Sequence, residues 1–202
     1  MIINRRSLLV LAVLAGLSPL HVQAAEPGRP EALVTSFVDQ ALVDIGDHTL
    51  ADRDREAKLA TLLEKYCDMP RISRFVAGAY WNGANAEDRT QFSDLFEQWL
   101  AHHVILFDKY GPKGVKVTGA RADGDTITMV STDVLYKNGD TPDKVDWVVR
   151  RDGNDFKVVD VIISGVSLAS TERQEIGSAI YNSGGSLVAA NAVLKSKLAN
   201  DN

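Results

Sequence analysis

The chain has 202 residues, of which 24% are charged and 45% are hydrophobic, and its formal net charge at pH 7 is -5. An acidic chain is a poor binder of nucleic acid and of anionic membrane surfaces, because both repel negative charge. Cys67 is the single cysteine, which excludes an internal disulfide, and we expect its thiol to be buried in a helix and inert.

The first 24 residues have the pattern of a cleavable signal peptide. Two arginines at positions 5 and 6 precede an apolar run over 8–17, and residues 22–24 (Val-Gln-Ala) form a small-residue cleavage site. The apolar run is too short for a membrane-spanning helix. We therefore expect export by the general or the twin-arginine route, and one mature domain over residues 25–202 with a net charge of -7.

Three helices are predicted in the first part of the mature chain. Apolar residues at helical spacing predict the first over Glu31–Asp47. The second is expected to start at Asp52 or Asp54, and it carries a stripe of leucines on one face. Pro70 suits the first turn of a third, short helix, where its missing N–H costs nothing.

A fourth, longer helix is predicted to start after Asn85. The Asn85 side chain suits the cap position, and Asp88 is a capping-box partner three residues on. Spacings of three and four place an aromatic stripe on one face of this helix, formed by Phe92, Phe96, Trp99, His103, Leu106 and Tyr110. Taken alone, such a stripe is typical of a packed core.

The second half is predicted to form four strands, Val115–Ala122, Thr126–Tyr136, Val145–Arg151 and Phe156–Ser164. The links between them are short and rich in Gly, Asp and Asn, which favours an antiparallel meander. In the second strand the apolar phase shifts between Met129 and Val134, which predicts a β-bulge there.

Two helices are predicted to close the chain, near Ser170–Tyr181 and Leu187–Leu198. Ser170 suits the cap of the first of them, with Glu172 and Arg173 in its first turn. The predicted fold class is α+β, in which N-terminal and C-terminal helices pack on a curved four-stranded antiparallel sheet.

The segment from Asp155 to Arg173 carries a recognisable pattern: an aromatic residue, Lys-Val, Asp-Val, a short apolar run, Gly, Val-Ser-Leu and a later arginine. This pattern resembles the C-terminal core of the Mla-type periplasmic phospholipid-binding proteins, also called the toluene-tolerance family, and of their hopanoid-associated relatives. The segments over 66–81 and 88–110, and the Gly-Leu tail after Gly184, resemble the same family. Ser164, His103 and Phe156 depart from its usual residues, which leaves the lipid class open.

The resemblance implies a carrier and not an enzyme. It implies a periplasmic monomer that binds phospholipid or a related lipid, needs no cofactor, and works with an inner-membrane ABC transporter complex and an outer-membrane lipoprotein and porin complex. It also implies an apolar cavity between sheet and helices. The residues expected to line that cavity are Trp99, Phe107, Val130, Trp147, Val149 and Ile163.

Two other functions remain open at this level. Asp160 on a buried strand has the residue type of a general base in a secreted cavity enzyme, although a carboxylate hydrogen-bonded to backbone or to an arginine is the simpler interpretation. An adaptor that binds envelope proteins and no small ligand is the third possibility. Ser167 lacks the flanking glycines of a nucleophile elbow, so we assign it a structural role.

A metal site is not predicted. His102 and His103 are adjacent on a helix, so their side chains point about 100° apart and cannot share one ion. His103 lies on the apolar stripe, where we expect a hydrogen-bonded core histidine, and we expect His102 to be solvated.

Overall fold

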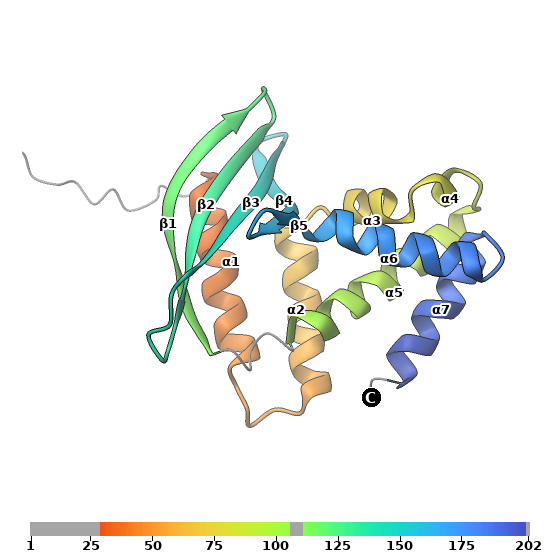
Figure 1. Cartoon of the computed structure of the whole chain (residues 1–202), viewed down its shortest axis with the longest axis horizontal. Helices are drawn as coiled ribbons and strands as arrows, with labels where there is room; N and C mark the ends of the chain where they lie inside the picture. The colour runs from red at the N-terminus through yellow and green to blue at the C-terminus, as the bar shows by residue number, and fades with distance from the viewer. Residues whose placement is uncertain (1–28, 106–110, 201–202) are drawn as a thin grey trace, which may run out of the picture.

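The computed structural model describes residues 29–105 and 111–200, which form an α+β fold. Figure 1 shows a curved sheet at one end of the molecule and most of the helices at the other. The predicted fold class is therefore confirmed. The predicted signal peptide falls in residues 1–28, and Phe107 and the last two residues of the predicted stripe, Leu106 and Tyr110, fall in 106–110; all of these lie outside the described residues.

All four helices predicted in the first half are confirmed, together with a short α4 that was not predicted. Their bounds are α1 Pro30–Ile45, α2 Asp52–Tyr66, α3 Met69–Ala77, α4 Ala79–Asn82 and α5 Ala86–Ile105. Asn85 caps α5 as expected, because its Oδ1 accepts a hydrogen bond from the Asp88 backbone N–H at 2.8 Å. Pro70 lies in the first turn of α3.

The sheet is an antiparallel meander of five strands and not of four. In the described chain its order follows the sequence, with β1 Pro112–Asp123, β2 Ile127–Tyr136, β3 Asp143–Asp152, β4 Asp155–Ile163 and β5 Val166–Ser167. The two-residue β5 pairs Ser167 with Ile162. A strand of this length carries no alternating pattern, which is why the prediction missed it.

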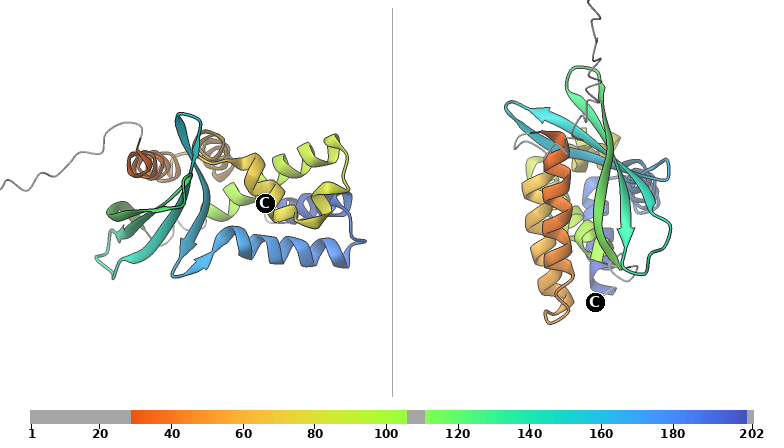
Figure 2. Two further views of the ribbon diagram at one scale, coloured as in Figure 1. Left: turned by 90° about the horizontal axis from the view of Figure 1, so that it is seen from above. Right: turned by 90° about the vertical axis from the view of Figure 1, so that its left-hand side faces the viewer.

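The predicted bulge exists in the β1–β2 pair, but it lies on the other strand. The register shifts between Val117 and Gly119 of β1, opposite Thr132 and Ser131 of β2, so the extra residue belongs to β1. A further shift lies in the β3–β4 pair, next to Val149. Bulges bend a strand and increase its twist, and the strands curve accordingly in Figure 2.

The C-terminal helices are α6 Leu168–Asn182 and α7 Leu187–Asn200. The prediction that Ser170 caps α6 is wrong, because Ser167 is the cap and its Oγ accepts a hydrogen bond from the Ser170 backbone N–H at 3.0 Å. The helix therefore starts directly after β5. Ser167 is held for this role by Asp160, a contact that a local sequence pattern does not reveal.

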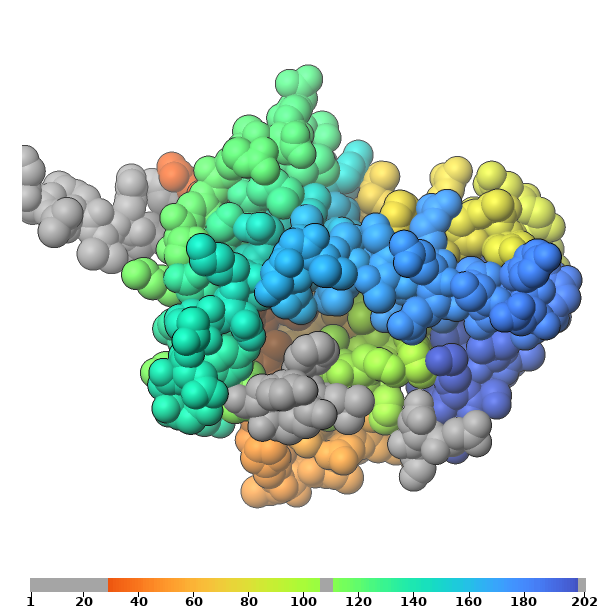
Figure 3. Space-filling model, in the orientation of Figure 1, coloured from red at the N-terminus to blue at the C-terminus, as the bar shows by residue number. Residues whose placement is uncertain are grey.

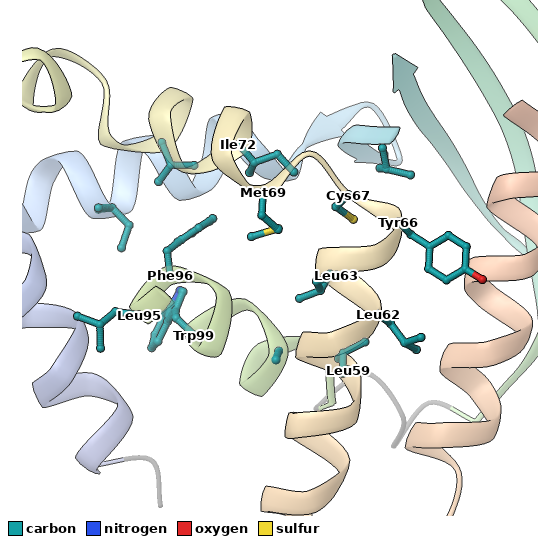
Figure 4. Close-up of a cluster of buried hydrophobic side chains, with 14 of the residues drawn as sticks. Leu59, Leu62, Leu63, Tyr66, Cys67, Met69, Ile72, Leu95, Phe96 and Trp99 are labelled. Carbon is teal, nitrogen blue, oxygen red and sulfur yellow. The ribbon is translucent and has the colours of Figure 1, made fainter. Parts of the chain in front are cut away.

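The helices form a layer on the sheet and a cluster beside it. Helix α1 packs against β1, β2 and β4, whereas α3 contacts α6 and α5 contacts α7. Figure 4 shows α2, α3 and α5 converging on one apolar cluster that includes Leu63, Ile72 and Phe96. In the described part of the chain, no helix has the length and hydrophobicity to cross a membrane.

Cys67 lies directly after α2 and not inside a helix. It forms a parallel bridge with Val158 of β4, and only 6% of the residue is exposed. Burial raises the pKa of its thiol to about 12, so the thiol is neutral at physiological pH. The prediction of a buried cysteine is confirmed.

Candidate functional site

A large cavity lies between the concave side of the sheet and the helices. Its volume is about 750 Å³, within the range of roughly 300–1,000 Å³ that small-molecule sites occupy. Figure 3 shows the surface hollowed between the teal β2–β3 hairpin, the blue helix α6 and the green helix α5. The cavity therefore has access to the outside of the molecule.

The walls of the cavity are mostly apolar. Helix α1 supplies one side, and α2 and α5 supply the next. The sheet closes the other side through β1, β2, β3 and β4. The apolar residues on the two walls are Phe37, Val38, Ala41, Leu42, Ile45, Leu59, Leu63, Ile72, Phe96, Leu100, Val104, Leu168 and Ala169 from the helices and Pro112, Val115, Val134, Val145, Trp147, Val158, Val159, Val161 and Ile163 from the sheet. Such walls favour hydrocarbon over water.

A polar rim lies at one end of the cavity, where the β2–β3 hairpin turns. It consists of Tyr136, Asn138, Asp140, Thr141 and Asp143. The Tyr136 hydroxyl donates a hydrogen bond to the Asp143 carboxylate, and burial together with that carboxylate raises the pKa of Tyr136 to about 12. The rim thus offers hydrogen-bonding groups to a ligand whose apolar part lies deeper.

Within the described residues, the side chains of the cavity lining that carry a formal charge at neutral pH are all carboxylates. They are Asp140, Asp143, Asp160 and Glu172, and no lysine or arginine lines the cavity in this part of the chain. Burial is the main cause that raises the pKa of Glu172. Its Oε2 accepts a hydrogen bond from the Trp99 indole N–H at 3.2 Å.

Of the six residues predicted to line the cavity, two are on its wall and three others are placed elsewhere. Trp147 and Ile163 line it. Val130 and Val149 are completely buried, but neither is among the described lining residues. Trp99 is also buried and is not among the described lining residues. Its indole N–H donates a hydrogen bond to Glu172, which does line the cavity, and the Lys197 ammonium lies 4.5 Å from the centre of its ring. The sixth, Phe107, lies outside the described residues.

The prediction missed the contribution of α1 and α2. Five residues of α1 line the cavity, from Phe37 to Ile45, and they belong to the stripe from which the helix was predicted. That stripe is wide enough to cover both a packed core and an open wall. The width of the stripe could have indicated that α1 lines a cavity. Val34 of this stripe is fully buried in the core, whereas Val38 and Ala41, on its other side, are half-buried at the cavity.

Asp160 lies at the edge of the cavity with both carboxylate oxygens engaged. Oδ1 accepts hydrogen bonds from the backbone N–H groups of Val161 at 2.8 Å and Ala169 at 3.0 Å, and Oδ2 accepts one from the Ser167 hydroxyl at 2.6 Å. The interpretation of a carboxylate bonded to backbone is confirmed, as is the structural role of Ser167. Asp160 joins β4 to the first turn of α6.

The histidines have local structural contacts. His103 Nδ1 lies 2.9 Å from the Trp99 carbonyl oxygen, as expected for a core histidine. The prediction that His102 is solvated is wrong, because its Nδ1 lies 2.7 Å from Glu56 Oε1 and its side chain is 14% exposed. Within the described residues, no group of three or more His, Cys, Asp or Glu side chains is placed to hold a metal ion.

Comparison with solved structures identifies a similar protein. The phospholipid-binding protein from Ralstonia solanacearum, solved in complex with a phospholipid, matches with a TM-score of 0.72 and 26% sequence identity. The match covers 85% of this chain and 97% of that one. No curated protein matches the chain.

A protein-family comparison gives the same assignment independently. The family model described as MlaC protein matches residues 35–192, which span helices α1 to α7 and the whole sheet. This agrees with the resemblance carried by the segment that ends at Arg173. The chain therefore belongs to the MlaC family.

Proposed function

We propose that this protein is a carrier of phospholipid or a closely related lipid. The observation that carries the proposal is the apolar cavity of about 750 Å³ between α1, α5 and the sheet. The Ralstonia solanacearum protein that shares this fold was solved with a phospholipid bound. In our proposal the acyl chains lie against the apolar walls, and the headgroup lies at the rim formed by the β2–β3 hairpin.

The free energy of transfer explains why such a lipid needs a carrier. Burial of one methylene is worth about 0.8 kcal/mol, so two acyl chains of about 16 carbons resist transfer into water by roughly 25 kcal/mol. A walled cavity replaces most of the lost hydrocarbon environment without covalent chemistry. Release then requires only that an acceptor binds the lipid more favourably than the carrier does.

The cellular setting is a further part of the proposal. The leader-like segment over residues 1–24 and the family resemblance favour the periplasm, with lipid moving between an inner-membrane ABC transporter complex and an outer-membrane complex. The protein needs no enzymatic activity for this role. The hydrogen bonding of Asp160 favours a carrier over an enzyme that uses this residue as a general base. Both carboxylate oxygens already accept hydrogen bonds within the fold.

Removal and return of lipid should change the melting temperature. A ligand that binds only the folded state stabilises it by about 2.7 kcal/mol at a concentration 100 times its Kd. In a domain of this size, that corresponds to roughly 5–10 °C. We expect delipidated protein to melt that much lower than lipid-loaded protein, in differential scanning fluorimetry, and to recover when phospholipid is added. Identical melting temperatures in the two forms would contradict the proposal.

A further inference from the structure

A second concavity lies outside the lipid cavity, between α3 and α6. It has a volume of about 640 Å³, and Figure 1 shows the two helices that form it running next to each other. We call it the arginine groove, because Arg71 and Arg74 of α3 and Arg173 of α6 line it. A wall only one residue thick separates it from the lipid cavity, since four residues line both: Ile72, Val159, Asp160 and Ala169.

The guanidinium of Arg173 is held in a fixed position in this groove. Its Nη1 donates a hydrogen bond to the Phe75 carbonyl oxygen at 3.0 Å, and its Cζ lies 4.8 Å from the centre of the Phe75 ring. Gly78 makes room for this arrangement, because a Cβ at that position would lie 3.2 Å from Arg173 Nη2. Positioning a guanidinium in advance reduces the conformational entropy that is lost when it binds an anion.

The other two arginines leave donors directed to solvent. Arg74 is exposed, and its side chain makes no hydrogen bond, ion pair or ring contact with another described residue. Arg71 forms an ion pair with Asp68 at 2.9 Å through its Nε, and its side chain remains 52% exposed. Three guanidinium groups therefore gather on one face, and Arg71 alone among them has a carboxylate partner within the described residues.

The charge of this groove is opposite to that of the chain. The formal net charge of the whole chain is -5, yet the described lining of the groove includes three arginines and one carboxylate, Asp160. That carboxylate already accepts three hydrogen bonds within the fold. A local concentration of arginine on an acidic protein attracts anionic groups specifically at that place.

We propose that the arginine groove is a docking site for an acidic segment of a partner protein. Arginine binds carboxylates through paired N–H donors, and a concave groove admits carboxylate side chains from a protruding segment. Phe75, which is 42% exposed at the edge of the groove, offers an apolar contact beside the charges. A flat anionic bilayer fits less well, because the net negative charge of the chain opposes its approach.

The proposal goes beyond lipid binding and does not depend on it. None of the three arginines lines the lipid cavity among the described residues. Docking at this place would nevertheless bring a partner to the outer side of the wall that encloses the lipid. Lipid content and partner binding are therefore separate measurements, and failure of one leaves the other standing.

The test uses the full-length mature protein and a fluorescent ten-residue peptide rich in Glu and Asp, with a Gln and Asn version as the uncharged control. The triple variant Arg71→Gln, Arg74→Gln and Arg173→Gln removes three charges from the groove. The matched control, Arg121→Gln, Arg150→Gln and Arg151→Gln, removes three charges from strands β1 and β3. Arg74→Glu alone serves as a variant whose folding is least affected, since this side chain has no described partner.

We expect the acidic peptide to bind wild-type protein in fluorescence anisotropy, with an affinity that falls as salt is added. The groove triple variant and Arg74→Glu should weaken binding about tenfold or more, which corresponds to about 1.4 kcal/mol. The control triple variant should change it far less, and lipid content should be the same in all variants. Equal weakening in both triple variants, absence of binding, or arginine-dependent binding to phosphatidylglycerol vesicles in place of the peptide would overturn the proposal.

Discussion

Ala41→Trp is expected to weaken phospholipid binding roughly 5- to 150-fold. Ala41 lies on α1 and lines the apolar cavity, so an indole at this position occupies space that the acyl chains need. Overpacking typically costs about 1–3 kcal/mol, and each 1.4 kcal/mol is about tenfold in affinity. The measurement is the amount of phospholipid extracted per mole of purified protein, followed by titration of delipidated protein with a fluorescent phospholipid.

Val43→Trp is the matched control for this experiment. Val43 is on the same helix two residues away, but it is 73% exposed and does not line the cavity. We expect it to keep the lipid content and affinity of the wild type. If Ala41→Trp folds with a normal circular dichroism spectrum and still binds lipid as the wild type does, the cavity is not the binding site.

Asp160→Ala is expected to destabilise the protein by about 2–3 kcal/mol. The substitution leaves two backbone N–H groups and the Ser167 hydroxyl without their acceptor at the junction of β4 and α6. An unsatisfied buried polar group costs about 1–3 kcal/mol, and these groups are half-buried, so water compensates in part. The melting temperature should fall by roughly 5–10 °C.

Asp155→Ala controls for the loss of a carboxylate from the same strand. Asp155 begins β4 and is exposed, so its removal should change the melting temperature little. The melting temperature of Asp160→Asn should lie between those of Asp160→Ala and Asp155→Ala, because the amide oxygen of asparagine keeps one acceptor. Unchanged stability of Asp160→Ala together with loss of lipid binding would show that Asp160 contacts the ligand directly.

The elements of the fold could be predicted where the signal is local. The Asn85 cap, the proline in the first turn of α3 and the turn sequences between strands each act over a few residues, and each prediction is confirmed. The cap of α6 was misplaced for the opposite reason. Ser167 and Ser170 are both suitable capping residues, and the choice between them depends on Asp160, which approaches from another strand.

The cavity lining was harder to predict than the fold. Alternation along β2 and β3 shows which side chains face inward, but it does not show whether they meet a helix or an open space. Val130 pairs with Trp147 across the two strands, yet Trp147 alone of this pair lines the cavity. Whether a buried side chain borders a cavity depends on where the helices stop packing, and that is a property of the tertiary structure.

Native mass spectrometry of protein purified without detergent or added lipid tests the central claim most directly. At about 24 cal/mol per Å³, a dry and empty cavity of about 750 Å³ would cost roughly 18 kcal/mol, more than the usual 5–15 kcal/mol stability of a domain. The cavity must therefore collapse, admit water or hold a ligand, and its apolar walls favour a lipid over water. The account therefore predicts the mass of the mature chain plus one bound phospholipid or related lipid. The bare polypeptide alone, with no lipid in a solvent extract of the same sample and no binding of added phospholipid, would contradict it.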